Sequence, residues 1–518
     1  MSYIVKQKVG KHIYLYEATS YWDKEKKQNR QKRKYLGKQD PKTGELISTK
    51  KTLSPKNVRD YGHVYLGKTI ANKIGLTECL KKSFPNNWNK LLHLALYQLI
   101  EARPMYMQSE WAQSCYVSNN MAMISQRISE TLKNLGVNDC ARTNFFKNWI
   151  ANQETPDGTW LDITSFSSYS QNIDFCEWGY NRDRESLPQV NLGLLVGSKT
   201  KLPYYYNVYP GSIADVSTLE KTTTIVKKLG AKIKTLIIDR GFYSASNIEM
   251  LCESKLKFVI PMPSNLKLTE KLLNSSSEKL GSMHEHIIHQ KEVIFYHQTE
   301  CQIGENKVTA FVFMDDKRRS YETQILLLKL HEIEELLKRK KFCDIDKAKE
   351  FIDGCFKGCS KLFEINKNSQ GEIVIKRDSK AVLSKQGKLG KFILITNEEE
   401  FDAKTIIAMY RQRDGVEKIF DYVKNELKID RLRIHSRDAL EGRLFIAFIA
   451  VILYTAILQA LKDTNLIKKY SVAKIMMELR KIRVIEFNDA ENMLSEVTKT
   501  QREILSALNI DLPNKPRY

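Results

Sequence analysis

A chain of 518 residues with 83 Lys and Arg against 61 Asp and Glu carries a formal net charge of +22. This length suffices for roughly two to four domains and a substantial core. A basic surplus of this size is typical of proteins that neutralise phosphates, so a nucleic acid is the expected partner. Because the basic residues are spread along the chain, they argue against one membrane-binding block.

The cysteines and the first residues indicate the compartment. The chain starts without a charged segment, apolar core and small-residue cleavage site in succession, so we do not expect secretion. Nine cysteines without a paired rhythm suit a reducing compartment, and the lone pair Cys355 and Cys359 is a weak zinc signal. No phosphate-binding loop of the GxxxxGK[ST] type occurs, so ATP is not implied. We expect a cytoplasmic protein.

Residues 1–60 predict a basic β-hairpin arm. Residues 12–17 alternate between polar and apolar side chains, and the pattern returns at residues 34–36 after a charged run. We expect the side chains of this run to contact DNA: Lys26, Lys27, Arg30, Lys32 and Arg33.

Residues 61–155 have helical periodicity and predict a helical DNA-binding domain. Within it, residues 125–133 form either a recognition helix, with Arg127 and Lys133 at the DNA, or an ordinary surface helix. Further along, residues 444–461 are almost entirely apolar and approach the length of a membrane span. Since this segment occurs once, inside a highly charged chain, it predicts a buried core helix, and no membrane partner is expected.

From Gly158 onward, strands alternate with a helix, which predicts a mixed α/β core. We place the first part of this core at residues 156–245 and the second part at 389–465. Between them, residues 246–388 predict an inserted, mostly β domain, because the segment has too much pattern for a loop. Residues 466–518 predict a C-terminal helical region. Asp162 and Asp239 each close a short apolar strand, where α/β sheets hold their active sites.

Four polar residues after the second core strand predict a stripe on one helix face: Tyr410, Arg413, Glu417 and Lys424 fall within roughly 60° of one another. The stripe is either a solvated face with an ion pair at i,i+4 spacing or part of a site that grips phosphates. Gly415 either admits a close DNA backbone or marks an irregularity of the helix. Together, Asp162, Asp239 and Glu417 supply hard oxygen ligands suited to two Mg²⁺ or Mn²⁺ ions.

With these residues in order, the chain resembles the DDE transposases of bacterial insertion sequences, in the branch marked by a Tyr-x2-Arg-x3-Glu-x6-Lys signature. The segments Leu161-Asp162-Ile163-Thr164 and Ile238-Asp239-Arg240-Gly241-Phe242 resemble the first and second acidic motifs of that family. The resemblance implies an RNase H-like core and makes Asp162, Asp239 and Glu417 the catalytic metal ligands. It makes Tyr410, Arg413 and Lys424 phosphate contacts.

The resemblance also implies partners and a location. The implied partners are the double-stranded DNA of inverted-repeat element ends, target DNA and a second copy of the chain that forms a homodimer on paired ends. The implied location is the nucleoid in a bacterial cytoplasm. A base-stacking aromatic residue of the inserted domain would be Phe295 or Tyr296, because no Trp follows Trp178.

Two other functions remain open: a structure-specific nuclease on the same core, and a DNA-binding protein with an inactive site. A zinc site at His284, His286 and His289 is also open, although no further ligand stands at a suitable spacing.

Overall fold

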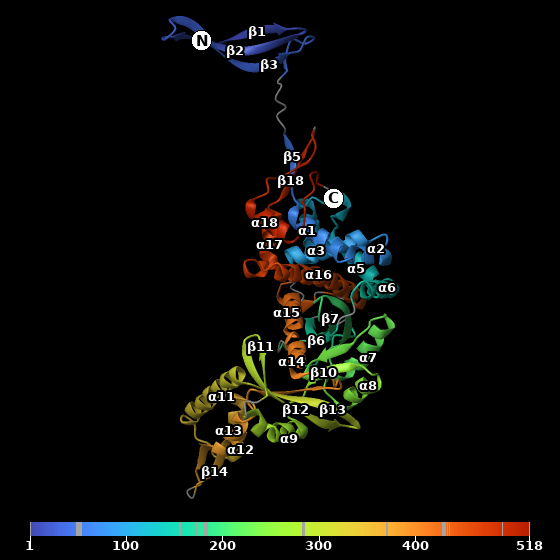
Figure 1. Cartoon of the computed structure of the whole chain (residues 1–518), viewed down its shortest axis with the longest axis vertical. Coiled ribbons are helices and arrows are strands. Elements are labelled where there is room, and N and C mark those ends of the chain that lie inside the picture. The colour runs from blue at the N-terminus through green and yellow to red at the C-terminus, as the bar shows by residue number, and fades with distance from the viewer. Residues whose placement is uncertain are drawn as a thin grey trace.

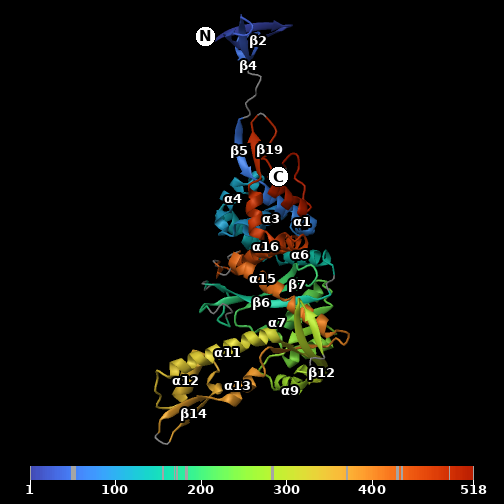
Figure 2. The ribbon, with the colours of Figure 1, turned by 60° about the vertical axis from the view of Figure 1, so that its left-hand side comes forward.

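The computed structural model describes residues 2–47, 54–154, 157–168, 170, 173–180, 185–281, 285–368, 371–426, 431–432, 434, 436–488 and 490–516. Four regions follow one another along the long axis of the molecule (Figures 1 and 2). They are an N-terminal sheet, a helical region, a large mixed sheet and a small subdomain at the opposite end.

The N-terminal sheet is antiparallel, with the order β1-β2-β3-β4. Its strands are β1 (Ser2–Val9), β2 (His12–Asp23), β3 (Gln28–Gln39) and β4 (Leu46–Ile47). The sequence predicted a simple hairpin, but β1 adds a strand because Gly10, at φ 59°, permits a two-residue turn into β2. Of the predicted DNA contacts, Lys26 and Lys27 lie in the turn between β2 and β3, and the other three lie on β3.

Residues 55–60, expected at the end of the arm, belong instead to a second sheet. There β5 (Pro55–Asp60) pairs with β18 (Arg483–Phe487), which also pairs with β19 (Met493–Leu494). The helical region beside this sheet is built from both ends of the chain. Its helices are α1 (Gly62–Lys73), α2 (Leu76–Ser83), α3 (Trp88–Glu101), α4 (Gln108–Ser114), α5 (Ser125–Val137), α6 (Asp139–Ala151), α17 (Val472–Arg480) and α18 (Lys499–Ala507).

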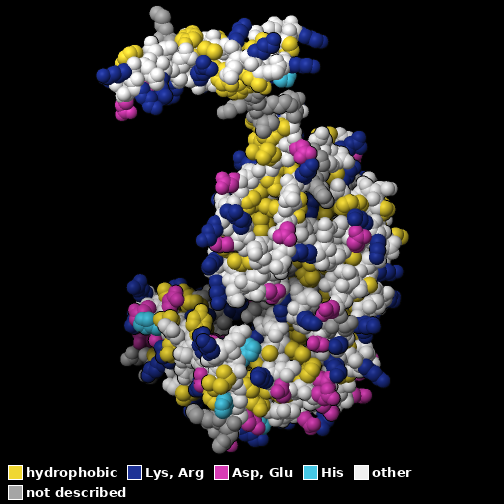
Figure 3. All heavy atoms as spheres, turned by 45° about the horizontal axis from the view of Figure 1, so that its top comes forward, with side chains coloured by type: hydrophobic (Ala, Val, Ile, Leu, Met, Phe, Trp, Pro, Cys, Tyr) yellow, Lys and Arg dark blue, Asp and Glu magenta, His cyan; other side chains and the backbone are white. Residues whose placement is uncertain are grey.

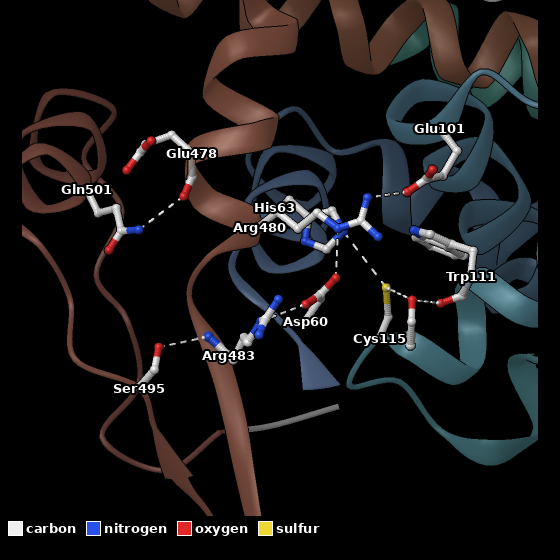
Figure 4. Close-up of polar contacts among 11 residues, drawn as sticks. Asp60, His63, Glu101, Trp111, Cys115, Glu478, Arg480, Arg483, Ser495 and Gln501 are labelled. Atoms are coloured by element: carbon white, nitrogen blue, oxygen red, sulfur yellow. Dashed lines mark hydrogen bonds and ion pairs between the residues drawn. The ribbon is translucent and has the colours of Figure 1, made fainter. Parts of the chain in front are cut away.

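An ion-pair network with buried acids and partly exposed arginines joins these distant segments (Figure 4). Asp60, 8% exposed, accepts hydrogen bonds from Arg480 Nε at 2.7 Å and from Arg483 Nε at 3.1 Å. Arg480 also donates from Nη1 to Glu101 Oε1 at 2.8 Å. Because the buried Asp60 carboxylate is hydrogen-bonded by two arginines of the C-terminal segment, it helps to hold that segment against the helical region.

The apolar segment predicted as a core helix is α16 (Arg437–Asp463). Length and composition would allow it to cross a membrane, but 72% of its most apolar window is buried inside the protein. It crosses α5 closely: a Cβ added to Gly442 would meet the carbonyl oxygen of Leu132, and one added to Gly136 would meet that of Asp438. The absence of a Cβ at both glycines therefore permits this close crossing. One side of α5 packs against α16, and its other side is exposed to solvent.

The central sheet is mixed, with the order β11-β12-β13-β16-β10-β9-β6-β7-β8, and β17 also pairs with β6. Strands β6, β7 and β8 form an antiparallel meander, whereas β9 and β10 continue the sheet parallel to β6. The strands of this part are β6 (Thr159–Ser168), β7 (Gln189–Gly197), β8 (Pro203–Pro210), β9 (Thr235–Ile238), β10 (Lys257–Pro261) and β17 (Arg431–Leu432), with helices α7 (Asp215–Lys228) and α8 (Ala245–Glu253) beside them. The mixed α/β fold agrees with the prediction.

Residues 246–388 differ from the predicted separate, mostly β domain. Three strands of this range, β11 (His286–His289), β12 (Glu292–Ile303) and β13 (Asn306–Asp315), extend the central sheet. They do so because β13 pairs along β16 (Lys391–Thr396), which belongs to the second part of the core, and β16 pairs with β10. The remainder is largely helical. It comprises α9 (Lys267–Ser275), α10 (Ser277–Gly281), α11 (Asp316–Leu337), α12 (Ile345–Cys355), the hairpin β14 (Phe363–Lys367) and β15 (Ile373–Arg377), and α13 (Ser379–Gln386).

The segment from α11 to α13 forms the subdomain at the end of the molecule. It has a small core of its own, built from Leu326, Leu330, Ile333, Ile352, Cys359, Leu362, Phe363 and Val382. Because strand pairing over long sequence distances decides which strands join the central sheet, periodicity alone did not separate this subdomain from the sheet.

Candidate active site

The two aspartates of the predicted site lie on adjacent parallel strands. Leu161 of β6 is in register with Ile238 of β9, so Asp162 and Asp239 are the next residues on the two strands. Asp239 follows β9 directly, as predicted. Asp162 does not end its strand as predicted, because β6 continues to Ser168 through its pairing with β7. The two aspartates nevertheless lie side by side on neighbouring strands of the central sheet.

The third acid comes from a broken helix that packs against β6. The predicted continuous stripe is divided between α14 (Ala403–Arg411) and α15 (Asp414–Asp421), with Arg413 in the turn between them. Asp402 caps α14, accepting from the Thr405 amide at 2.8 Å. Gly415 is the second residue of α15, directly after the break, and its amide donates to the Gln412 carbonyl at 3.1 Å, so it does mark a helix irregularity. A Cβ added there would meet only the Trp160 ring, at 3.9 Å.

Arg413 brings the three predicted acids together. Its Nη1 lies 3.3 Å from Asp162 Oδ2 and 3.7 Å from Asp239 Oδ2. Its Nη2 donates to Glu417 Oε1 at 2.5 Å. Because one guanidinium touches all three carboxylates, the acids surround a common centre, and Arg413 lies inside the site instead of at its rim.

The electrostatics of this centre favour positive charge. The Arg413 side chain is 12% exposed, Asp162 13%, Asp239 33% and Glu417 52%. Burial by itself would lower the pKa of Arg413, but Asp239, Asp162, Tyr410 and Glu417 together raise it above its ordinary value. The guanidinium is therefore held charged among the acids.

The remaining residues of the signature lie on the same broken helix. Arg413 is positioned over the Tyr410 ring, 5.7 Å from its centroid, and burial raises the pKa of Tyr410. Lys424 is half-buried in a π-helical segment, Tyr422–Glu426, that continues α15. Such π-helical segments occur frequently at functional sites.

The donor set fits a hard divalent cation by its chemistry. Three carboxylates offer only oxygen ligands, which suit Mg²⁺ or Mn²⁺, and they already surround one cationic group. Within the described ranges, no group of three or more His, Cys, Asp or Glu side chains is placed to hold a metal ion as it stands. The fit therefore requires that Arg413 leave the centre of the three acids.

A second cationic group beside the site was not found from the sequence. Lys201, in the turn between β7 and β8, places its Nζ 4.1 Å from the centroid of the Trp160 ring and donates to Gln412 Oε1 at 2.9 Å. Burial, with a smaller effect of Lys462, lowers its pKa to about 8. Lys201 belongs to no recognisable sequence motif. Its position beside the site follows only from the pairing of β6 with β7, which brings the β7–β8 turn next to Trp160.

The predicted DNA-binding residues lie outside this site. Lys26 and Lys27 are exposed in the β2–β3 turn, and Arg30, Lys32 and Arg33 are exposed on β3, in the sheet at the far end of the molecule (Figure 1). Arg127 and Lys133 are exposed on α5, where Arg127 pairs with Glu130 at 3.0 Å.

The two remaining predicted sites are on β11 and β12. His286 and His289 lie on β11, whereas His284 lies outside the described residues. Phe295 and Tyr296 are half-buried on β12, in the central sheet instead of a separate domain, with their rings near His286 and Phe313 respectively. The zinc site and the base-stacking role therefore stay predictions.

Comparisons with known proteins give one family. A family model described as "Transposase DDE domain" matches residues 153–453, a range that contains all three acids and Arg413. A search of curated proteins found no match. Among solved structures, the chain is similar to a piggyBac transposase synaptic complex with hairpin DNA, at 12% identity and a TM-score of 0.34 over 81% of this chain and 69% of the other. At that score the likeness supports no detailed comparison.

Proposed function

Because the chain belongs to the family of transposases with a DDE domain, we propose that it binds the ends of an insertion sequence, cleaves phosphodiesters there and transfers the strands to target DNA. The observation that carries this proposal is the convergence of Asp162, Asp239 and Glu417 on the single guanidinium of Arg413. The net charge of +22 supports a polyanionic substrate.

The core of the sheet supports an RNase H-like assignment. Three antiparallel strands, β6, β7 and β8, are followed by two strands, β9 and β10, on the other side of β6 and parallel to it. An order in which the first strand stands between the meander and the parallel strands is typical of RNase H-like folds. In this arrangement the first and second acids come from the two central strands.

The chemistry follows from the residues of the site. DDE transposases generally use divalent metal ions, and we propose that Asp162, Asp239 and Glu417 hold two Mg²⁺ or Mn²⁺ ions. Such ions would activate a water molecule or a DNA 3′-hydroxyl and stabilise the leaving oxygen. Tyr410, Arg413 and Lys424 would grip the phosphates of the cleaved end, with Arg413 moving from the acids to the DNA.

Two rival functions differ from this one in measurable ways. A structure-specific nuclease would use water as the final nucleophile, so it would cut DNA without joining it to a target. An inactive DNA-binding protein would do neither. A strand-transfer assay with a duplex that ends in the inverted repeat flanking the gene separates the three, because joined products arise only from a transposase.

The test of the catalytic residues is neutralisation of each acid. Asp162→Asn, Asp239→Asn and Glu417→Gln should each abolish cleavage while leaving binding to the end duplex largely intact. A matched control is Glu292→Gln, since Glu292 also pairs with an arginine of α14, Arg411 at 3.1 Å, but lies outside the three-acid cluster. Full cleavage by any of the three variants would remove that residue from the site.

We further propose that the chain acts as a homodimer on paired element ends, at the nucleoid in the bacterial cytoplasm. The mass of the complex with end duplex, measured by light scattering, should correspond to two chains. A complex containing a single chain would contradict the dimer without bearing on the chemistry.

A further inference from the structure

The N-terminal sheet has two different faces. In a strand, successive side chains point to opposite sides, and residues paired across strands share a side. The pairs Tyr16 with Tyr35 and Ala18 with Arg33 therefore lie on one face, whereas Thr19 with Lys32 lies on the other. We call these the aromatic face and the basic face.

The aromatic face gathers most of the rings of the sheet. The ring centroids of Tyr35 and Tyr16 are 5.3 Å apart, and those of Tyr35 and Tyr14 are 6.1 Å apart. The pairing register places the following residues on this face: Tyr3, Tyr14, Tyr16, Trp22, Asn29, Gln31, Arg33 and Tyr35. Here the guanidinium of Arg33 donates to its neighbour Gln31 Oε1 at 3.1 and 3.3 Å.

The basic face gathers most of the cations. The register places Lys6, Lys8, Arg30, Lys32 and Lys34 on it, with Glu17 and Asp23 as acidic neighbours. All five cationic residues are exposed. In the described part of the chain, only Arg30 of the five has an ion pair, with Asp23 at 3.5 Å. Four ammonium groups are thus available to a partner.

The geometry of the cations suits an extended polyanion. Arg30, Lys32 and Lys34 alternate along β3, so their Cα atoms are spaced by about 7 Å, twice the rise of an antiparallel strand. Lys6 and Lys8 repeat this spacing on β1, at the other side of β2. Figure 3 shows the sheet standing apart from the body, with Lys and Arg side chains exposed along it. A row of evenly spaced cations matches a row of phosphates better than a single anionic group.

We propose that the basic face is the surface on which this sheet docks to the phosphate backbone of double-stranded DNA, and that the aromatic face points away from that backbone. The proposal rests on the proposed function, which supplies DNA as the partner. It separates residues that the sequence had grouped together, because Lys32 and Arg33 are neighbours in the chain but lie on opposite faces.

The test compares two substitutions that each remove one positive charge from adjacent exposed positions. Lys32→Gln and Arg33→Gln are made in the full chain, and binding to a random-sequence duplex is measured by fluorescence anisotropy over a salt series. Each phosphate contact contributes about 0.9 to the slope of log K against log salt concentration. Lys32→Gln should lower the slope by about 1, and the double variant with Lys34→Gln by about 2. Arg33→Gln should leave it unchanged.

The outcomes separate the face from the function. Two outcomes would overturn the assignment of the basic face while leaving DNA binding intact. In one, Lys32→Gln and Arg33→Gln give equal slopes; in the other, neither variant changes the slope although the parent chain binds with a steep one. A parent chain that binds no duplex would count against the proposed function itself. Binding of the parent to anionic phospholipid vesicles that is lost in Lys32→Gln, without an effect on duplex binding, would assign the face to a membrane surface instead. Unchanged melting temperatures show that both variants fold.

Discussion

Removing the charge of Arg413 should destabilise the protein in the absence of divalent cations. At an effective dielectric constant of about 20, unit charges at the 3.3 Å of the Arg413 to Asp162 pair attract by about 5 kcal/mol, before desolvation is subtracted. Removing one partner of such a buried pair costs about 3–5 kcal/mol, because the other charge stays buried. The half-exposed Glu417 adds at most about 1 kcal/mol. We therefore expect Arg413→Gln to lower the free energy of unfolding by about 3–5 kcal/mol.

Divalent cations should offset much of this loss. With Arg413 replaced by Gln, the three carboxylates have no internal cation, so Mg²⁺ binds without first displacing a guanidinium. A ligand at about 100 times its Kd stabilises the folded state by about 2.7 kcal/mol. The parent chain should gain less from the same Mg²⁺ concentration, since part of the binding free energy is used to displace Arg413.

The assay is urea unfolding followed by tryptophan fluorescence, with and without Mg²⁺. Arg411→Gln is the matched control, because Arg411 ends α14 two residues before Arg413 and pairs with Asp315 at 2.6 Å and Glu292 at 3.1 Å, outside the three-acid cluster. It should destabilise the protein comparably without an enhanced Mg²⁺ response. If Mg²⁺ stabilises Arg413→Gln no more than the parent chain, the three acids do not form a common cation site.

Three further predictions concern other groups of the structure. The pKa of Lys201 is about 8, so its side chain loses its charge as the pH rises from 7 to 9. If Lys201 binds a DNA phosphate, the affinity for duplex should fall by up to about tenfold over this range, and Lys201→Arg should remove that fall. An equal fall in the variant would exclude Lys201 as a phosphate contact. Burial lowers the pKa of His63 from 6.5 to about 4, so the unfolded chain takes up a proton that the folded chain rejects, and stability should fall between pH 6.5 and 4 by up to about 3 kcal/mol. Urea unfolding at pH 7 and 4.5 should show a smaller difference in His63→Asn than in the parent. Asp60→Asn should cost about 1–2 kcal/mol, because both arginine partners of Asp60 are roughly half-exposed, and it should speed proteolytic release of the C-terminal segment. Glu491→Gln, which breaks an exposed pair with Lys515, should change neither.

The sequence located the acids of the candidate site but not the geometry between them. Asp239 was identifiable because it ends an apolar strand, and the spacing from Tyr410 to Lys424 selected Glu417. The strand register that sets Asp162 beside Asp239, and the helix break that turns Arg413 inward, depend on contacts between residues about 80 and 250 positions apart. Local periodicity holds no information on such contacts. The catalytic roles of these residues stay predictions.

The fold was predictable to a similar degree. The mixed core, the helical region and the buried helix α16 each follow from local pattern. The β character of part of residues 246–388 was also predicted, but whether the strands form a domain of their own or extend the central sheet is decided by the pairing of β13 with β16 across the α11–α13 subdomain. For the N-terminal sheet, composition indicated the cations, and only the register of β2 with β3 assigns them to a side.

The pairing of β5 with β18 has a consequence for synthesis on the ribosome. Asp60 and its partner Arg483 are separated by 423 positions, so the strand leading to the N-terminal sheet has no mate until nearly the whole polypeptide has emerged. A product that stops early, through a nonsense codon or a broken message, would leave this strand unpaired and its carboxylate without either arginine. In such a fragment β5 would have no partner strand, so the N-terminal sheet would have no fixed position relative to the catalytic region.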